Sequence, residues 1–132
     1  MEFISNPKQS ISILLVEDDE PTLDCLAIIL NKKYPDATIY SACNGKTGLE
    51  LFKEHLPDIV ITDINMPEMN GVQMANELRA IKPTTKIIVL TGDCKKHLLQ
   101  DSVEKGFKCD HFIVKPVVIK DLFAAIENCL GD

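Results

Sequence analysis

The sequence predicts an α/β fold in which helices cover both faces of a doubly wound, five-stranded parallel sheet. Two observations support this fold class. Short apolar runs rich in Ile, Val and Leu recur along the chain, and segments of helical length and periodicity alternate with them. Continuous apolar runs are typical of strands buried on both faces of a parallel sheet, and right-handed helical crossovers join such strands.

Size and composition agree with one domain of this kind. The chain has 132 residues, of which 45% are hydrophobic, and its mean hydropathy is +0.05. A chain of this length usually forms one domain, and the apolar content is sufficient for a buried core. We therefore expect one domain over residues 11–132, preceded by a flexible lead-in over residues 1–10.

The expected strands are five apolar runs, and turn signals separate them from the helices. The runs span residues 11–16, 37–40, 59–62, 86–90 and 112–114. The turn signals are Asn44-Gly45, Asn70-Gly71, Pro83 and Gly106.

The expected helices follow from apolar stripes with helical spacing. The first stripe has the i, i+3, i+4, i+7 pattern, and it follows two acidic residues suited to capping and a proline suited to the first helical position. Three similar stripes predict further helices, and a less regular stripe predicts a helix over residues 95–104. The residues are Leu23, Leu26, Ala27 and Leu30, after Asp19, Glu20 and Pro21; Leu49 and Phe52; Met74, Leu78 and Ile81; Leu98, Leu99 and Val103; and Leu122, Ile126, Cys129 and Leu130.

Charge and cysteine content exclude several classes of function. The chain has 14 basic and 20 acidic residues, a net charge of −6 and a pI near 5.0, which disfavour direct binding to nucleic acid or to a membrane surface. It contains neither a signal peptide nor the run of about 18 apolar residues that spans a membrane, so we expect a soluble, cytoplasmic protein. The five cysteines form no CxxC pair and are expected to be reduced thiols.

Polar residues follow four of the expected strands. In an open parallel sheet, ligands bind beyond the carboxyl ends of the strands, so these residues are expected to share one edge of the sheet. Each of them alone also fits an ordinary strand end or helix cap, and their joint placement favours a site. They are Glu17-Asp18-Asp19 after the first strand, Asp63 after the third, Thr91-Gly92 after the fourth and Lys115-Pro116 after the fifth.

The carboxylates in this set predict a divalent cation. Several acids that converge at one edge repel each other unless a cation lies between them. A site with only oxygen ligands and few carboxylates suits Mg²⁺ better than Ca²⁺, and the spacing of an EF-hand loop is absent.

The remaining residues are suited to phosphoryl chemistry. A carboxylate beside a bound metal, here Asp63, can attack phosphorus and give an aspartyl phosphate. Thr91 offers a hydroxyl to a phosphoryl oxygen, Gly92 allows close backbone approach, and Lys115 can balance the charge of the transferred group. The sequence leaves open whether the bond between Lys115 and Pro116 is cis or trans.

At these residues the sequence resembles the receiver domains of two-component response regulators. The resemblance extends from Ile11 to about Leu130, and it depends on the acid pair Glu17-Asp18, the run that contains Asp63, and Lys115-Pro116. It implies a flavodoxin-like (βα)5 receiver fold. It also implies a signalling domain that assists its own phosphorylation and dephosphorylation and is not an enzyme.

The resemblance implies a role for each site residue, and the chain departs from the family pattern in two places. Phe112 replaces a frequent tyrosine and lacks its hydroxyl, and the segment Gly106–His111 is a longer and more basic approach to the fifth strand. The implied roles are phosphoacceptor for Asp63; Mg²⁺ binding by the carboxylates of Asp18 and Asp63, by Glu17 mostly through water and by the backbone carbonyl of Asn65; phosphoryl binding or switching for Thr91, Gly92, Lys115 and Phe112; and a cis peptide bond at Pro116.

The implied partners are a phosphoryl donor and a downstream protein. The donor is a sensor histidine kinase or a histidine phosphotransfer protein, whose phosphohistidine transfers its phosphoryl group to Asp63. The face formed by the fourth helix, fifth strand and fifth helix then changes, so that it binds the downstream protein, or the phosphoryl group passes to another histidine. A homodimer that forms on phosphorylation is also left open.

Three alternatives remain at this point. The chain could be a receiver cut from a longer response regulator or hybrid kinase. It could be a small Mg²⁺-dependent phosphohydrolase that forms an aspartyl phosphate, although Asn65 stands where such an enzyme favours a second acid and no cap insertion is present. It could be a flavodoxin-like cofactor binder, although Glu17-Asp18-Asp19 would repel a phosphate.

Overall fold

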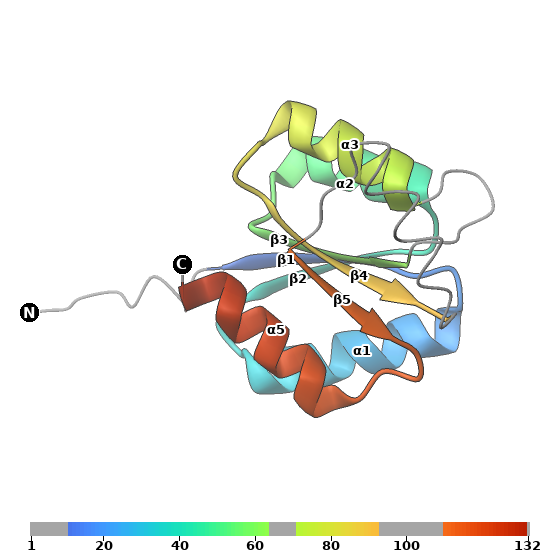
Figure 1. The fold of residues 1–132 in the computed structure, drawn as a ribbon, viewed down its shortest axis with the longest axis vertical. Helices are drawn as coiled ribbons and strands as arrows, with labels where there is room; N and C mark the ends of the chain where they lie inside the picture. The colour runs from blue at the N-terminus through green and yellow to red at the C-terminus, as the bar shows by residue number, and fades with distance from the viewer. Residues whose placement is uncertain (1–10, 64–70, 93–109, 132) are drawn as a thin grey trace, which may run out of the picture.

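Five parallel strands form a single sheet in the order β2-β1-β3-β4-β5 (Figure 1). The computed structural model describes residues 11–63, 71–92 and 110–131. The strands are β1 (Ser12–Val16), β2 (Thr38–Ala42), β3 (Ile59–Asp63), β4 (Lys86–Thr91) and β5 (His111–Val114), and the helices are α1 (Glu20–Lys33), α2 (Gly45–His55), α3 (Gly71–Ile81) and α5 (Ile119–Gly131).

The order in which the chain adds strands to the sheet reverses between β1 and β3. The chain runs from β1 to β2 at one edge and then returns to β3 on the other side of β1. Such a reversal leaves a crevice beyond the carboxyl ends of the two central strands. The residues that follow β1 and end β3 are therefore the ones that the topology brings together.

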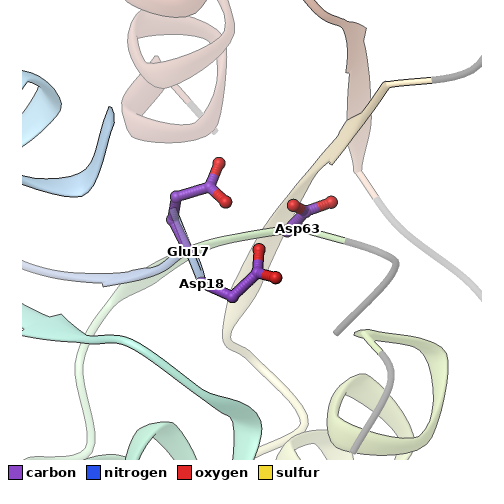
Figure 2. A group of neighbouring side chains, drawn as sticks. All are labelled: Glu17, Asp18 and Asp63. Carbon is purple, nitrogen blue, oxygen red and sulfur yellow. The ribbon is translucent and has the colours of Figure 1, made fainter. Parts of the chain in front are cut away.

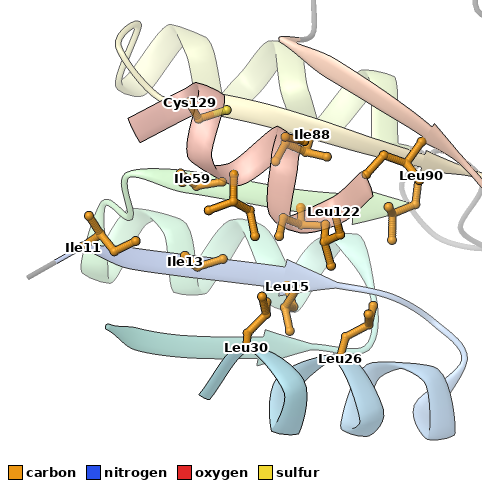
Figure 3. Close-up of a cluster of buried hydrophobic side chains, with 14 of the residues drawn as sticks. Ile11, Ile13, Leu15, Leu26, Leu30, Ile59, Ile88, Leu90, Leu122 and Cys129 are labelled. Carbon is orange, nitrogen blue, oxygen red and sulfur yellow. The ribbon is translucent and has the colours of Figure 1, made fainter. Parts of the chain in front are cut away.

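Helices cover both faces of the sheet. Figure 1 shows α1 and α5 on one face and α2 and α3 on the other. The face toward α1 and α5 contributes the larger buried cluster, shown in Figure 3, and the face toward α2 and α3 contributes a second one. The larger cluster includes Ile13, Leu15, Leu26, Leu30, Ile59, Ile88, Leu90 and Leu122, and the second includes Leu14, Val16, Phe52, Val60, Met74 and Leu78.

Helix α1 begins directly after the acidic residues that follow β1. Asp19 is the N-cap, and its side chain accepts a hydrogen bond from the backbone N–H of Thr22 at 3.1 Å. Such a bond satisfies one of the free donors in the first turn of a helix. The sequence predicts Pro21 as the first helical residue. The helix begins one residue earlier, at Glu20, so Pro21 is its second residue.

Helix α2 begins at the predicted Asn44-Gly45 turn. Asn44 is its N-cap and accepts a hydrogen bond from the N–H of Thr47 at 2.8 Å, and Gly45 is already the first helical residue. Leu56 is the C-cap of this helix: it has a left-handed conformation with φ of 48° and donates its N–H to the carbonyl of Phe52. This ending closes the last turn and directs the chain toward β3.

The predicted fold class is confirmed, and four of the five predicted strands agree with the observed strands within one residue at each end. The second strand is an exception: it was predicted over residues 37–40 and it lies at Thr38–Ala42. Within the predicted stripes, Ile81 is 42% exposed because it is the last residue of α3, beyond the part that packs on the sheet. The lead-in over residues 1–10 and the helix expected over residues 95–104 lie outside the described residues. None of the described helices is both long enough and apolar enough to span a membrane.

Thr85→Val is expected to raise the free energy of unfolding. The Thr85 hydroxyl is buried before β4, and within residues 11–63, 71–92 and 110–131 it has no hydrogen-bond partner. A methyl group of similar size removes the cost of burying that hydroxyl, so we expect a gain of about 1 kcal/mol in a urea titration. The adjacent, exposed Thr84 is the control, and Thr84→Val should change the value little. A loss of stability in Thr85→Val alone would show that the hydroxyl has a partner.

Candidate functional site

The site lies at the carboxyl edge of the sheet, where β1 and β3 end side by side. Glu17 follows β1, and its backbone N–H donates to the carbonyl of Ala42 at 3.1 Å, which holds the chain in line with β2. Asp63 is the last residue of β3, and all five residues of this strand are buried. Because both strands are central in the sheet, the positions of their last residues are fixed by neighbours on two sides.

Three carboxylates meet at this edge. Figure 2 shows Glu17, Asp18 and Asp63 gathered at the ends of β1 and β3, and one oxygen of each lies within 4.8 Å of one oxygen of the others. Glu17 is fully buried and Asp63 nearly so, whereas Asp18 is exposed. Only oxygen atoms are offered, which is the donor set that Mg²⁺ prefers.

Lys115 joins two of these carboxylates. It follows β5, and its ammonium nitrogen Nζ lies 2.6 Å from Glu17 Oε1 and 2.8 Å from Asp63 Oδ2. Its backbone N–H donates to the carbonyl of Thr91 at 2.6 Å, so the end of β5 is tied to the end of β4. The peptide bond between Lys115 and Pro116 is cis, the isomer that the resemblance implies.

Burial and the hydrogen bonds of Lys115 shift the pKa values of two groups in this site. Burial raises the pKa of Glu17, and this effect exceeds the opposing effect of its hydrogen bond from Lys115. Burial alone would lower the pKa of Lys115, but the hydrogen bonds to Asp63 and Glu17 together raise it. The second oxygen of Glu17 accepts a hydrogen bond from the backbone N–H of Asp19 at 3.1 Å. The site therefore holds a charged lysine and an excess of negative charge that a divalent cation would offset.

Of the other predicted site residues, Thr91 and Gly92 lie at the same edge of the sheet. The two exceptions are Phe112, which lies within β5, and Asn65. Thr91 ends β4 and is buried, and among the described residues a Cβ atom on Gly92 would meet the side chain of Lys115, at 4.0 Å. Phe112 lies within β5 and its side chain is 56% exposed, so in this structure the ring faces solvent. Asn65 lies outside the described residues.

A sequence profile decides which family the chain belongs to. The profile of the response regulator receiver domain matches residues 13–127, which is most of the chain. The chain belongs to this family.

Individual relatives of this receiver domain differ in length. The chemotaxis protein CheY of Bacillus subtilis is 31% identical over 118 residues, which cover 89% of this chain and 97% of CheY. The uncharacterized transcriptional regulatory protein YesN of the same organism is 29% identical over 121 residues, which cover 91% of this chain but only 32% of YesN. The receiver domain thus spans about a third of that relative.

Solved structures agree with the fold. The crystal structure of a CheY-like response regulator receiver domain protein from Methanospirillum hungatei has a TM-score of 0.83 and 27% sequence identity. The match covers 92% of this chain and 94% of that one. The five-stranded flavodoxin-like fold of this receiver domain is therefore the fold of its family.

Sequence reasoning missed one pair of residues in this receiver domain that bears on the site. Asp110, directly before β5, forms an ion pair with Arg79 of α3, with 3.0 Å between Arg79 Nη2 and Asp110 Oδ2. The two residues are 31 positions apart, and neither belongs to an apolar stripe or a strand-end motif. No local pattern in the sequence links them.

Proposed function

We propose that this receiver domain accepts a phosphoryl group on the carboxylate of Asp63 in a reaction that requires Mg²⁺. The observation that supports it best is the position of Asp63: one of its oxygens is held by Lys115 Nζ at 2.8 Å, and the oxygens of Glu17 and Asp18 lie close by. A carboxylate fixed in this way, with the ammonium group of Lys115 on one oxygen and two further carboxylates close by, is suited to attack phosphorus.

The residues at this edge fit a bound Mg²⁺. Glu17, Asp18 and Asp63 offer oxygen ligands, and a site of few carboxylates leaves other positions of the metal to water and to phosphoryl oxygens. The carbonyl of Asn65 is expected to add one further oxygen. When bound, Mg²⁺ would offset the negative charge shared by the carboxylates and the incoming phosphoryl group.

The proposed step moves one phosphoryl group from nitrogen to oxygen. An oxygen of Asp63 forms a bond to the phosphorus of a phosphohistidine, and the bond between phosphorus and the imidazole nitrogen breaks. The electron pair of that bond stays on the imidazole, which takes up a proton from solvent. Lys115 already binds Asp63 Oδ2, so it lies where it can balance charge on the phosphoryl oxygens with little movement.

The donor is proposed to be a sensor histidine kinase or a histidine phosphotransfer protein. A groove that Lys115 helps to line lies between α1 and the segment that joins β5 to α5, and it is proposed to receive part of the donor protein. The groove is lined mainly by apolar side chains, among them Leu26, Ile29, Pro116 and Val117.

Phosphorylation is proposed to act as a switch on the β5 and α5 face. The buried hydroxyl of Thr91 would move toward the new phosphoryl oxygens, and the exposed ring of Phe112 would then occupy the space beside it. A ring that is 56% exposed at present gains burial by such a movement, so the phosphorylated state would favour the inward position. A downstream protein would read this change, or the phosphoryl group would pass to another histidine.

Two further points belong to the same proposal. The domain is a phosphoacceptor in the cytoplasm and not a metabolic enzyme, and it works alone or as part of a longer regulator such as YesN, of which it would span about a third. A homodimer formed on phosphorylation would use the same β5 and α5 face.

The test is intact mass after incubation with Mg²⁺ and acetyl phosphate. We expect a single phosphoryl adduct, lost in Asp63→Asn and lost when Mg²⁺ is chelated. The matched control is Asp58→Asn, because Asp58 lies at the opposite end of β3, where its carboxylate accepts the N–H of Ser12 at 2.9 Å. This control should still form the adduct.

Two outcomes would contradict the proposal. An adduct that persists in Asp63→Asn would place the phosphoryl group on another residue. Steady release of phosphate from acetyl phosphate without any adduct would favour the phosphohydrolase alternative.

A further inference from the structure

The position of strand β5 determines where Lys115 lies, because Lys115 directly follows this strand. Strand β5 has four residues and lies at the edge of the sheet, where its ladder partner is β4, in a register from Ile88 opposite His111 to Thr91 opposite Val114. A slip of one residue would move its end by about 3.3 Å. Such a shift would break the contacts of Lys115 with Glu17 and Asp63, which are 2.6 and 2.8 Å long.

The residue before β5 supplies two contacts that fix this register. The backbone N–H of Asp110 donates to the carbonyl of Ile87 at 2.8 Å, and the backbone N–H of Ile87 donates to Asp110 Oδ2 at 2.7 Å. The side-chain carboxylate of Asp110 therefore accepts the N–H of Ile87 in β4. Strand β5 starts one residue later, at His111, and does not pair with this N–H. Asp110 thereby closes a ring of two hydrogen bonds with one residue of β4.

Helix α3 orients this carboxylate. Arg79, in the last turn of α3, places Nη2 3.0 Å from the same oxygen that accepts the Ile87 N–H. Both side chains are largely covered, with 29% of Arg79 and 28% of Asp110 exposed. Because α3 packs on the sheet through Met74 and Leu78, the guanidinium group is attached to a fixed support.

The far end of β5 is held in the functional site itself. The N–H of Lys115 donates to the carbonyl of Thr91, and its ammonium group lies between Glu17 and Asp63. If the start of the strand were free, the four-residue ladder and these contacts of Lys115 would have to resist the slip without it.

We propose that Asp110, oriented by Arg79, is a positioning residue that fixes the register of β5 and so holds Lys115 between Glu17 and Asp63. The catalytic consequence rests on the proposed function, in which Lys115 balances charge during phosphoryl transfer. The structural consequence, a fixed register of β5, does not depend on that function.

The first experiment measures the register without any phosphoryl chemistry. In Asp110→Ala we expect the amide proton of Lys115 to exchange with solvent at least about tenfold faster, and the cross-strand NOEs between Val89 and Phe112 to weaken. Asp110→Asn keeps an oxygen that can accept the Ile87 N–H, so it should restore most of the protection. The matched control is Lys82→Met, which removes an ion pair between the residue that directly follows α3 and Asp58, the residue directly before the central strand β3.

The second experiment measures the rate of phosphorylation by acetyl phosphate at saturating Mg²⁺. Asp110→Ala and Arg79→Met are expected to slow it, Asp110→Ala by about tenfold, because a misplaced Lys115 loses its aligned contact with Asp63. Lys82→Met should leave it unchanged. In a Lys115→Met background the Asp110→Ala change should have almost no further effect, because the residue through which it acts is gone.

These readouts separate a positioning role from a merely structural one. Asp110→Ala would overturn the inference if it lowered the free energy of unfolding while leaving the Lys115 amide protected and the rate unchanged. An equal loss of rate with and without Lys115 would also overturn it. If the unsubstituted chain forms no adduct, the proposed function fails while the exchange and NOE data still decide whether Asp110 fixes the register.

Discussion

Lys115→Met is expected to slow phosphorylation by acetyl phosphate about a hundredfold, which is typical for removal of one charge-stabilising donor from an active site. The reason is geometric, since Nζ lies 2.8 Å from Asp63 Oδ2 and would otherwise balance charge on the phosphoryl oxygens. Methionine keeps most of the length and apolar volume of the side chain and removes only the charge. Single-turnover kinetics at saturating Mg²⁺ would measure the effect.

The same change is expected to lower the free energy of unfolding by about 3 kcal/mol without Mg²⁺, because it removes the positively charged partner of a buried carboxylate. Glu17 is fully buried, and Lys115 donates to its Oε1 at 2.6 Å. Added Mg²⁺ should therefore stabilise Lys115→Met more than the unsubstituted protein, because the metal would replace the missing positive charge. Urea titrations with and without Mg²⁺ would measure both effects.

Lys82→Met is the matched control for this substitution. Its side chain is 27% exposed, close to the 25% of Lys115, and its ion pair with Asp58 lies at the opposite edge of the sheet, 3.6 Å long. Lys82→Met should lower the free energy of unfolding by less than about 1 kcal/mol, as the loss of a partly exposed ion pair usually does. It should leave the rate of phosphorylation unchanged. Equal effects of the two substitutions would mean that Lys115 has no special role at the site.

Sequence patterns were sufficient for the fold because the strongest signals arise from burial. The run from Ile59 to Ile61 has no polar interruption, and all of β3 is buried. The second strand was placed less well, because Ser41 interrupts its apolar run and the burial of Ala42 depends on neighbouring elements. A small residue carries little information about burial until the packing around it is known.

The site was predictable for a topological reason and only in part. The carboxyl ends of parallel strands meet at one edge, so the acids after β1 and β3 could be placed near Lys115 without coordinates. The binding of Lys115 to Glu17 could not be predicted, because it depends on which of several nearby carboxylates its flexible side chain reaches. The contact between Arg79 and Asp110 depends on how α3 packs, which no local pattern encodes.

Gly48→Ala is expected to lower the free energy of unfolding by about 2 kcal/mol, the usual cost of an extra methyl group in a filled core. Helix propensity alone would predict the opposite sign, since alanine within a helix such as α2 is favoured over glycine by up to about 1 kcal/mol. In Gly48→Ala, packing determines the sign of the change in the free energy of unfolding. A Cβ atom on Gly48 would lie 2.9 Å from Val16 Cγ2 and 3.4 Å from Met74 Sδ, and both residues are fully buried.

Two further variants separate this clash from a general effect of alanine. Gly131→Ala is the control, because a Cβ atom there meets no described residue within 4 Å, and it should leave the free energy of unfolding unchanged or slightly raised. Val16→Ala removes the atoms that clash, so the loss in the double variant should be smaller than the sum of the two single losses, by about 1 kcal/mol or more. Strictly additive losses would show that Gly48 is not required for the approach of α2 to β1.

Because Val16 directly precedes Glu17, a shift of Val16 in Gly48→Ala should also weaken Mg²⁺ binding, whereas Gly131→Ala should not.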